Sequence, residues 1–214
     1  MKHITYKVCE FGELSEEAQE RATYRLDDAG LLYWDDFILE EWEDLLEALG
    51  YRDAKIYYRG FYNQGDGACF ACESINPEIW LEHAAQTRDY SEDAQLVYEA
   101  YRGYKIDFYA RVKHEGRYYH EKSVYPVVEW DILDDASEEE VAAIKRAVCN
   151  LKEFMRKEIV DISRKIYREL ESEYESSLSP KNVEEYCRSN EVYFFENGDI
   201  APYEWVVQIE SSSV

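Results

Sequence analysis

The sequence predicts an α+β fold in which an antiparallel sheet of hairpins packs against amphipathic helices. Residues 104–113 alternate between apolar and other side chains, as expected for a strand with one buried face. Residues 31–49 and about 138–176 instead repeat apolar side chains every three or four positions, which is the period of an amphipathic helix. The second of these helices is very long, roughly 58 Å at ~1.5 Å per residue.

The N-terminal part begins with an expected strand over residues 3–11 and continues, over residues 14–50, as a strongly acidic pair of helices. Ser15 is a suitable N-cap for the first helix, and two glutamates follow it in the first turn, where the helix dipole favours negative charge. A glycine ends each helix. The apolar stripe of the second helix consists of Trp34, Phe37, Ile38, Trp42, Leu45, Leu46 and Leu49.

The middle of the chain, residues 51–131, is expected to be rich in strands. The expected elements are strands over 54–61 and 68–75, helices near 78–85 and 92–101, and strands over 104–113 and 117–131. Loops rich in turn-forming residues join the strands of each pair. Pro126 restricts the last strand to an edge or a bulge, because proline has no N–H to donate to a neighbouring strand.

The last part, residues 137–210, contains the long helix and a closing hairpin. Ser137 and Glu140 form a capping box at the start of the long helix. After it we expect a short helix over about 180–189 and two strands over 192–195 and 203–209.

The apolar stripe of the long helix is longer than strands of usual length can cover. Two arrangements would cover it: a homodimer through this helix, or a kink near Lys157 that folds the helix back on its own domain. The basic residues of this helix could pair with the acidic helices of the same or of a neighbouring subunit. The whole chain, residues 1–214, is expected to form a single domain.

The charge of the chain is strongly negative and unevenly distributed. Its net charge is −23, which repels nucleic acids and anionic membranes and attracts basic proteins. Residues 10–50 hold 14 acids and two bases, and residues 129–140 hold seven acids and no base. Residues 141–170, in contrast, hold eight bases and four acids.

The acidic helix over residues 31–49 is the main candidate for partner binding. Residues 26–50 contain no base, although solvent-exposed helix faces normally mix charges of both signs. The alternative is that this face is only solvated. The carboxylates expected to bind the partner are Asp27, Asp28, Asp35, Asp36, Glu40, Glu43, Asp44 and Glu47, with Glu138, Glu139 and Glu140 as a second patch.

The cysteines and the absence of long apolar segments indicate a soluble protein of the cytosol. Five cysteines are scattered along the chain, an odd number that is typical of free thiols. Cys69 and Cys72 form a CxxC pattern, which we interpret as core packing because no second ligand pair accompanies it. A metal site at these cysteines is the weaker alternative, and no cofactor is expected.

Residues 60–70 read GFYNQGDGACF, and this segment resembles the GFxxQGDGAxF segment of acidic phage and mobile-element proteins that lack an assigned function. Residues 14–18 and the acidic, tryptophan-containing stretch after them are similar to that group as well. The resemblance implies a phage or mobile-element context. By analogy of class it suggests the DNA mimics that inhibit restriction and CRISPR systems.

The leading hypothesis is therefore an inhibitor, not an enzyme, that binds a basic nuclease or effector of a bacterial defence system in the host cytoplasm. It would present carboxylates where phosphates would lie and would not contact nucleic acid or membranes itself. An antitoxin or regulatory partner of a basic protein is the first alternative. A metal-dependent enzyme is the second, and it depends on Cys69 and Cys72.

Overall fold

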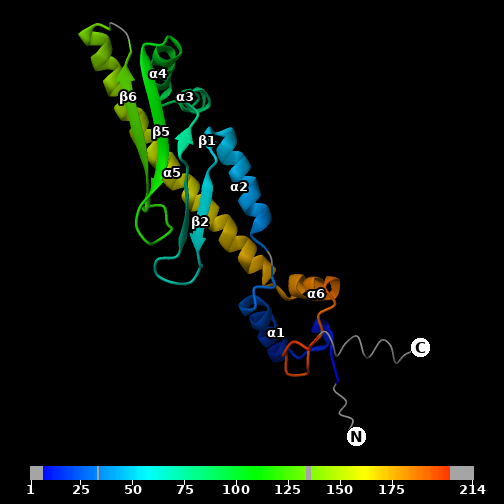
Figure 1. The fold of residues 1–214 in the computed structure, drawn as a ribbon. Coiled ribbons are helices and arrows are strands. Elements are labelled where there is room, and N and C mark those ends of the chain that lie inside the picture. Colours follow the sequence, from blue (N-terminus) through cyan, green and yellow to red (C-terminus); the bar gives the residue numbers. More distant parts are fainter. Residues whose placement is uncertain (1–6, 33, 134–135, 203–214) are drawn as a thin grey trace. The chain divides into compact units, whose positions relative to one another are not determined.

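The computed structural model describes residues 7–32, 34–133 and 136–202. The chain divides into two compact units, one made of Met1–Asp36 with Ser172–Val214 and the other of Phe37–Glu171. The single domain over residues 1–214 that the sequence predicts stays a prediction. The α+β fold class is confirmed, with antiparallel hairpins and one long helix (Figure 1).

The first unit is built around helix α1 (Glu16–Asp28), a short 3-10 helix η1 (Phe11–Glu13) and helix α6 (Pro180–Ser189). The Ser15 hydroxyl accepts a hydrogen bond from the Ala18 amide, so the predicted N-cap is confirmed. The core of this unit consists of Cys9, Phe11, Leu14, Ala18, Ala22, Leu26, Leu32, Val183, Cys187 and Phe194.

In the first unit, the described segments around Cys9 and Phe194 pair through isolated backbone bridges. Cys9 forms an isolated antiparallel bridge with Phe194, and Phe194 forms another with Ile200. The strand predicted over residues 3–11 is therefore reduced, in its described part, to one bridge, because η1 begins at Phe11. The second strand of the predicted closing hairpin lies outside the described residues. Its turn is present, since the Phe195 amide donates to the Asp199 carbonyl at 2.9 Å.

The second unit contains two hairpins. In the first, β1 (Tyr51–Arg52) pairs with β4 (Ser74–Ile75), and β2 (Lys55–Arg59) pairs with β3 (Gly67–Ala71). Both pairs keep the same register, so they form a single hairpin with an interruption at residues 53–54 and 72–73. At this interruption Cys72 bonds instead with Val112 of the other hairpin, through two hydrogen bonds of 3.1 Å.

The other hairpin consists of β5 (Ile106–His114) and β6 (Val124–Ile132). Their register runs without a bulge, and Pro126 lies opposite Val112 on a strand that pairs only with β5 among the described residues. The edge position predicted for Pro126 is thus confirmed. The return strand starts later than predicted, since residues 117–123 form a loop.

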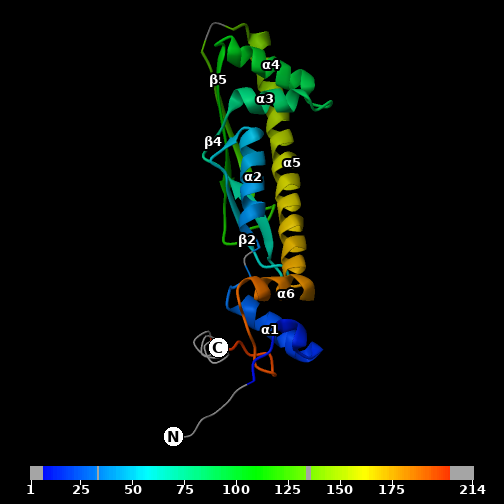
Figure 2. The ribbon, with the colours of Figure 1, turned by 90° about the vertical axis from the view of Figure 1, so that its right-hand side faces the viewer.

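Four helices complete this unit: α2 (Asp36–Ala48), α3 (Pro77–Ala85), α4 (Ser91–Arg102) and most of α5 (Glu138–Ser177). The strands and α2 run alongside α5 (Figures 1 and 2). The buried residues of α5 are Ile144, Ala147, Val148, Leu151, Phe154, Met155, Ile159, Ile162, Ser163, Ile166 and Leu170. The helix is unbroken through Lys157, so the predicted kink is wrong, and its stripe is buried within one chain. A homodimer through α5 stays a prediction. The reason for it was an uncovered apolar stripe, and this stripe is largely buried within the chain.

Candidate protein-binding surface

Helix α2 has a buried face and an outer face. Trp42 and Leu46, one turn apart, are buried, and the indole Nε1 of Trp42 donates to Glu169 Oε2 of α5 at 2.7 Å. A tryptophan with its N–H bonded in this way fixes the rotation of α2 about its own axis. The side chains on the opposite side of α2 consequently face away from the core.

The outer face carries carboxylates that lack a compensating charge. Glu40, Glu41, Glu43 and Asp44 are exposed, and none of them forms an ion pair within the described residues. Positions three and four apart on a helix lie about 5–6 Å from each other, so these groups form a dense row of negative charge. Glu47 differs, because it pairs with Arg52 at 3.3 Å and accepts a hydrogen bond from the Asp53 amide.

The outer face also exposes two large apolar side chains. Phe37 is 69% exposed and Leu45 is 45% exposed, so the predicted stripe of seven apolar residues is only partly buried. Phe37 lies three and four positions before Glu40 and Glu41, so two carboxylates neighbour it on the next turn of the helix. An apolar anchor within a charged rim is typical of protein-binding surfaces.

The other predicted residues of the N-terminal part are assigned to the first unit. Asp27, Asp28 and Asp35 belong to the first unit, and Asp27 accepts a hydrogen bond of 2.8 Å from the Tyr174 hydroxyl. Asp36, assigned to the same unit, is the first residue of α2 and is exposed. Trp34, a member of the predicted apolar stripe, is half-buried, and the centroid of its ring lies 5.3 Å from that of Tyr174.

The second predicted patch lies in the first turn of α5, where Glu138 and Glu139 are exposed. Glu140 forms the predicted capping box with Ser137 and also pairs with Lys105 at 3.3 Å. The hydrogen bond from the Ser137 amide, followed by those from the Ser137 and Lys105 side chains, lowers the pKa of the Glu140 carboxyl. Glu140 thus has partners within the chain, unlike the carboxylates of α2.

The basic residues of α5 do not neutralise α2. Arg164 pairs with Glu121 and Asp161, and Lys157 donates to the Tyr90 hydroxyl at 3.0 Å. In the described residues, no ion pair connects α5 with α2, so the pairing is not found between these two helices of one chain, and pairing with a neighbouring subunit stays a prediction.

A different glutamate, Glu158, is nearly buried at the middle of α5, and the sequence analysis did not single it out. The Tyr51 hydroxyl and Trp80 Nε1 donate to its Oε2 at 2.5 and 2.9 Å, and His83 Nε2 lies 2.5 Å from its Oε1. Burial opposes ionisation, but these three hydrogen bonds prevail and lower the pKa of Glu158. The hydrogen bond between His83 and Glu158 in turn raises the pKa of His83.

The CxxC cysteines lie in the core, as predicted. Cys69 and Cys72 are buried, and burial raises the pKa of each thiol to about 11. Cys69 Sγ accepts a long hydrogen bond from the Ser123 hydroxyl at 3.8 Å. Within the described parts of the chain, no three His, Cys, Asp or Glu side chains are grouped as a metal site.

The GFxxQGDGAxF segment forms the tight connection between β2 and β3. Asp66 Oδ2 accepts hydrogen bonds from the Tyr62 and Asn63 amides at 2.9 and 2.5 Å, which confirms the predicted turn. Gly67 packs so closely on the loop after β5 that a Cβ there would lie 2.8 Å from the Tyr119 carbonyl oxygen. The contacts of this segment are thus those of a structural turn.

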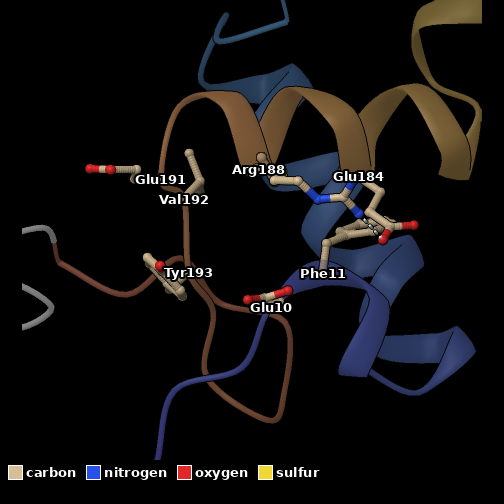
Figure 3. A pocket seen from close by; sticks show the side chains of 8 residues that line it. Glu10, Phe11, Glu184, Arg188, Glu191, Val192 and Tyr193 are labelled. Carbon is tan, nitrogen blue, oxygen red and sulfur yellow. Dashed lines mark hydrogen bonds and ion pairs between the residues drawn. The ribbon is translucent and has the colours of Figure 1, made fainter.

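A small hollow in the first unit offers little room for a ligand (Figure 3). Its volume of about 50 Å³ has room for about one or two water molecules. Arg188 beside it points toward Glu184, and their side chains form an ion pair at 2.8 Å.

The family of the chain follows from its sequence. Residues 34–180 match the family model described as Domain of unknown function (DUF8835), and this match covers more than half of the chain. The protein therefore belongs to this family. No curated protein and no solved structure matches it. Among the described residues, no helix is both long and apolar enough to cross a membrane.

Proposed function

We propose that the protein binds a basic, nucleic-acid-binding protein through the outer face of α2 and inhibits it stoichiometrically. The observation that carries this proposal is the pattern of side chains on one helix face. Four exposed carboxylates, Glu40, Glu41, Glu43 and Asp44, have no ion-pair partner in the described residues, and the exposed Phe37 lies one turn before the first two of them. Lysines and arginines of a partner would pair with the carboxylates while Phe37 enters an apolar pocket.

The further proposal that the partner is a nuclease or effector of a bacterial defence system depends on the resemblance of residues 60–70 to phage and mobile-element proteins. A row of carboxylates on a rigid helix supports this proposal physically, because a nucleic-acid channel is lined with cations spaced for phosphates. The fixed orientation of α2, held by the Trp42–Glu169 hydrogen bond, provides that rigidity.

The test uses the whole protein as bait in a bacterial lysate, with two variants of equal net charge. One variant carries Glu40→Lys, Glu43→Lys and Asp44→Lys on α2. The control carries Glu153→Lys, Glu173→Lys and Glu175→Lys, all at exposed positions of α5. We expect the wild type and the control to retain a basic protein at about 50 mM salt and to lose most of it at about 300 mM, where charges are strongly screened. The α2 variant should not retain it at either concentration.

Competition with duplex DNA then separates the two candidate modes. Displacement of the partner by DNA supports inhibition by mimicry, because both ligands would occupy the same channel. Retention that is insensitive to salt and to DNA, but lost in Phe37→Ala, would favour the regulatory or antitoxin-like mode with an apolar interface. Equal retention by both lysine variants would contradict the role of α2.

A further inference from the structure

The first unit contains a groove that is separate from α2. Its volume is about 670 Å³, within the range of about 300–1,000 Å³ that is usual for ligand pockets. Its lining residues come from η1, from α1, from the end of α5, from the connection after it and from the start of α6. They are Phe11, Glu16, Gln19, Glu20, Thr23, Tyr24, Asp27, Tyr174, Leu178 and Pro180.

One wall of the groove is a complete face of α1. The six α1 residues that line it occupy the i, i+3, i+4, i+7, i+8 and i+11 positions from Glu16 to Asp27, which share one face of a helix. The opposite face of α1 is buried through Ala18, Ala22 and Leu26. The helix is thus anchored on one side and open on the other.

The groove combines an acidic rim with an apolar floor. Glu16 and Glu20 are exposed and form no ion pair with any described residue. Tyr24 is 64% exposed at the wall, and the half-buried Leu178 and the buried Phe11 contribute apolar surface. This pattern complements a segment that carries both lysine or arginine and an apolar side chain.

We propose that this groove binds a short basic amphipathic peptide segment of a partner protein. An apolar side chain of the peptide packs on Tyr24 and Leu178, and its basic residues pair with Glu16 and Glu20. This surface lies in a different unit from the outer face of α2, so the inference does not depend on the proposed function.

The negative charge of the groove rim favours a basic ligand over other segments of this chain. A second copy of the chain has a net charge of −23 and is repelled by an acidic rim. Residues 203–214 contain Glu204 and Glu210 and no lysine or arginine, so they are equally poor partners. Residues 1–6 include Lys2, so the test separates binding of the peptide from competition by this segment.

The experiment measures the binding of a fluorescent leucine–lysine peptide of about 12 residues, the length that spans the open face of α1. A peptide with glutamate in place of lysine and a peptide with serine in place of leucine are the ligand controls. We expect Glu20→Lys and Tyr24→Ala each to weaken binding by about tenfold or more. The matched control Glu185→Lys, at an exposed position of α6, should change affinity less than about twofold.

Several outcomes would overturn the proposal. Equal weakening by Glu20→Lys and Glu185→Lys would show that only the overall charge attracts the peptide. Equally tight binding of the serine peptide would show that the apolar floor is not used. If the Lys2→Glu variant bound the peptide more tightly than the wild type, the N-terminal segment of the chain itself would be the occupant of the groove. Circular dichroism of each variant verifies that α1 and α6 remain folded.

Discussion

Glu158 at the middle of α5 and the carboxylates on the outer face of α2 are the same chemical group, but the first is buried and hydrogen-bonded and the others are exposed to solvent. Glu158 is 10% exposed in its side chain, and it accepts hydrogen bonds from Tyr51 and Trp80 and contacts His83. Glu40 and Asp44 are exposed and form no ion pair among the described residues. A buried carboxylate requires such partners, because desolvation of a bare charge costs far more than folding can supply. An exposed row of like charges stabilises nothing and is available to a partner.

The largest effect should come from Glu158→Ala. This change leaves the Tyr51 hydroxyl and the Trp80 N–H without their acceptor, and each such buried group costs about 1–3 kcal/mol. We expect the free energy of unfolding to fall by about 3–5 kcal/mol, measured by urea denaturation. Glu153→Ala, at an exposed position of the same helix, is the control and should cost less than about 0.5 kcal/mol. A similar loss in both variants would mean that the buried cluster contributes nothing specific.

The pH dependence of stability should reveal the same cluster. The pKa of His83 is raised in the folded state, so its contribution is complete below the ordinary histidine value of 6.5 and is lost as the pH rises through the folded-state pKa. The pKa of Glu158 is lowered, so its contribution is complete above the ordinary value of 4.5 and is lost as the pH falls through the folded-state pKa.

The difference in melting temperature between the wild type and His83→Gln isolates this contribution from the many other carboxylates. It should be largest between about pH 4.5 and 6.5 and should decrease on the alkaline side. A difference that is constant from acid to alkaline pH would contradict the His83–Glu158 pair.

The smallest effect should come from neutralising α2 with Glu40→Gln, Glu43→Gln and Asp44→Asn. Glu40 lies three positions before Glu43 and four before Asp44 and is repelled by both, so neutralisation should stabilise the chain slightly, by about 0.2–0.5 kcal/mol for each of these two pairs. Chemical denaturation of the triple variant measures this change. A loss above about 1 kcal/mol would instead reveal that these carboxylates support the fold.

Local patterns predicted the helices well where local chemistry sets their ends. The first helix was expected to follow its N-cap Ser15 and the long helix its capping box at Ser137, and both begin there. The second helix was expected from residue 31 but begins at Asp36. Between the two helices, the Leu31 amide still bonds to the Leu26 carbonyl, and Trp34 packs on Tyr174, a residue far away in the sequence. A contact between residues so far apart produces no periodic pattern in the sequence, so the start of the second helix could not be predicted from periodicity.

The sequence by itself determined the α+β class, the hairpins, the long helix and the concentration of acids near α2, since caps, turn residues, periodicity and charge are all local properties. Only the tertiary structure decided which members of an apolar stripe are covered. Phe37 and Trp42 both belonged to the predicted stripe, yet Trp42 is buried against α5 and Phe37 is exposed. The physical reason is that burial depends on which elements meet. The same reason explains Glu158, whose three partners come from strand β1 and helix α3 and lie 75 to 107 positions away in the sequence.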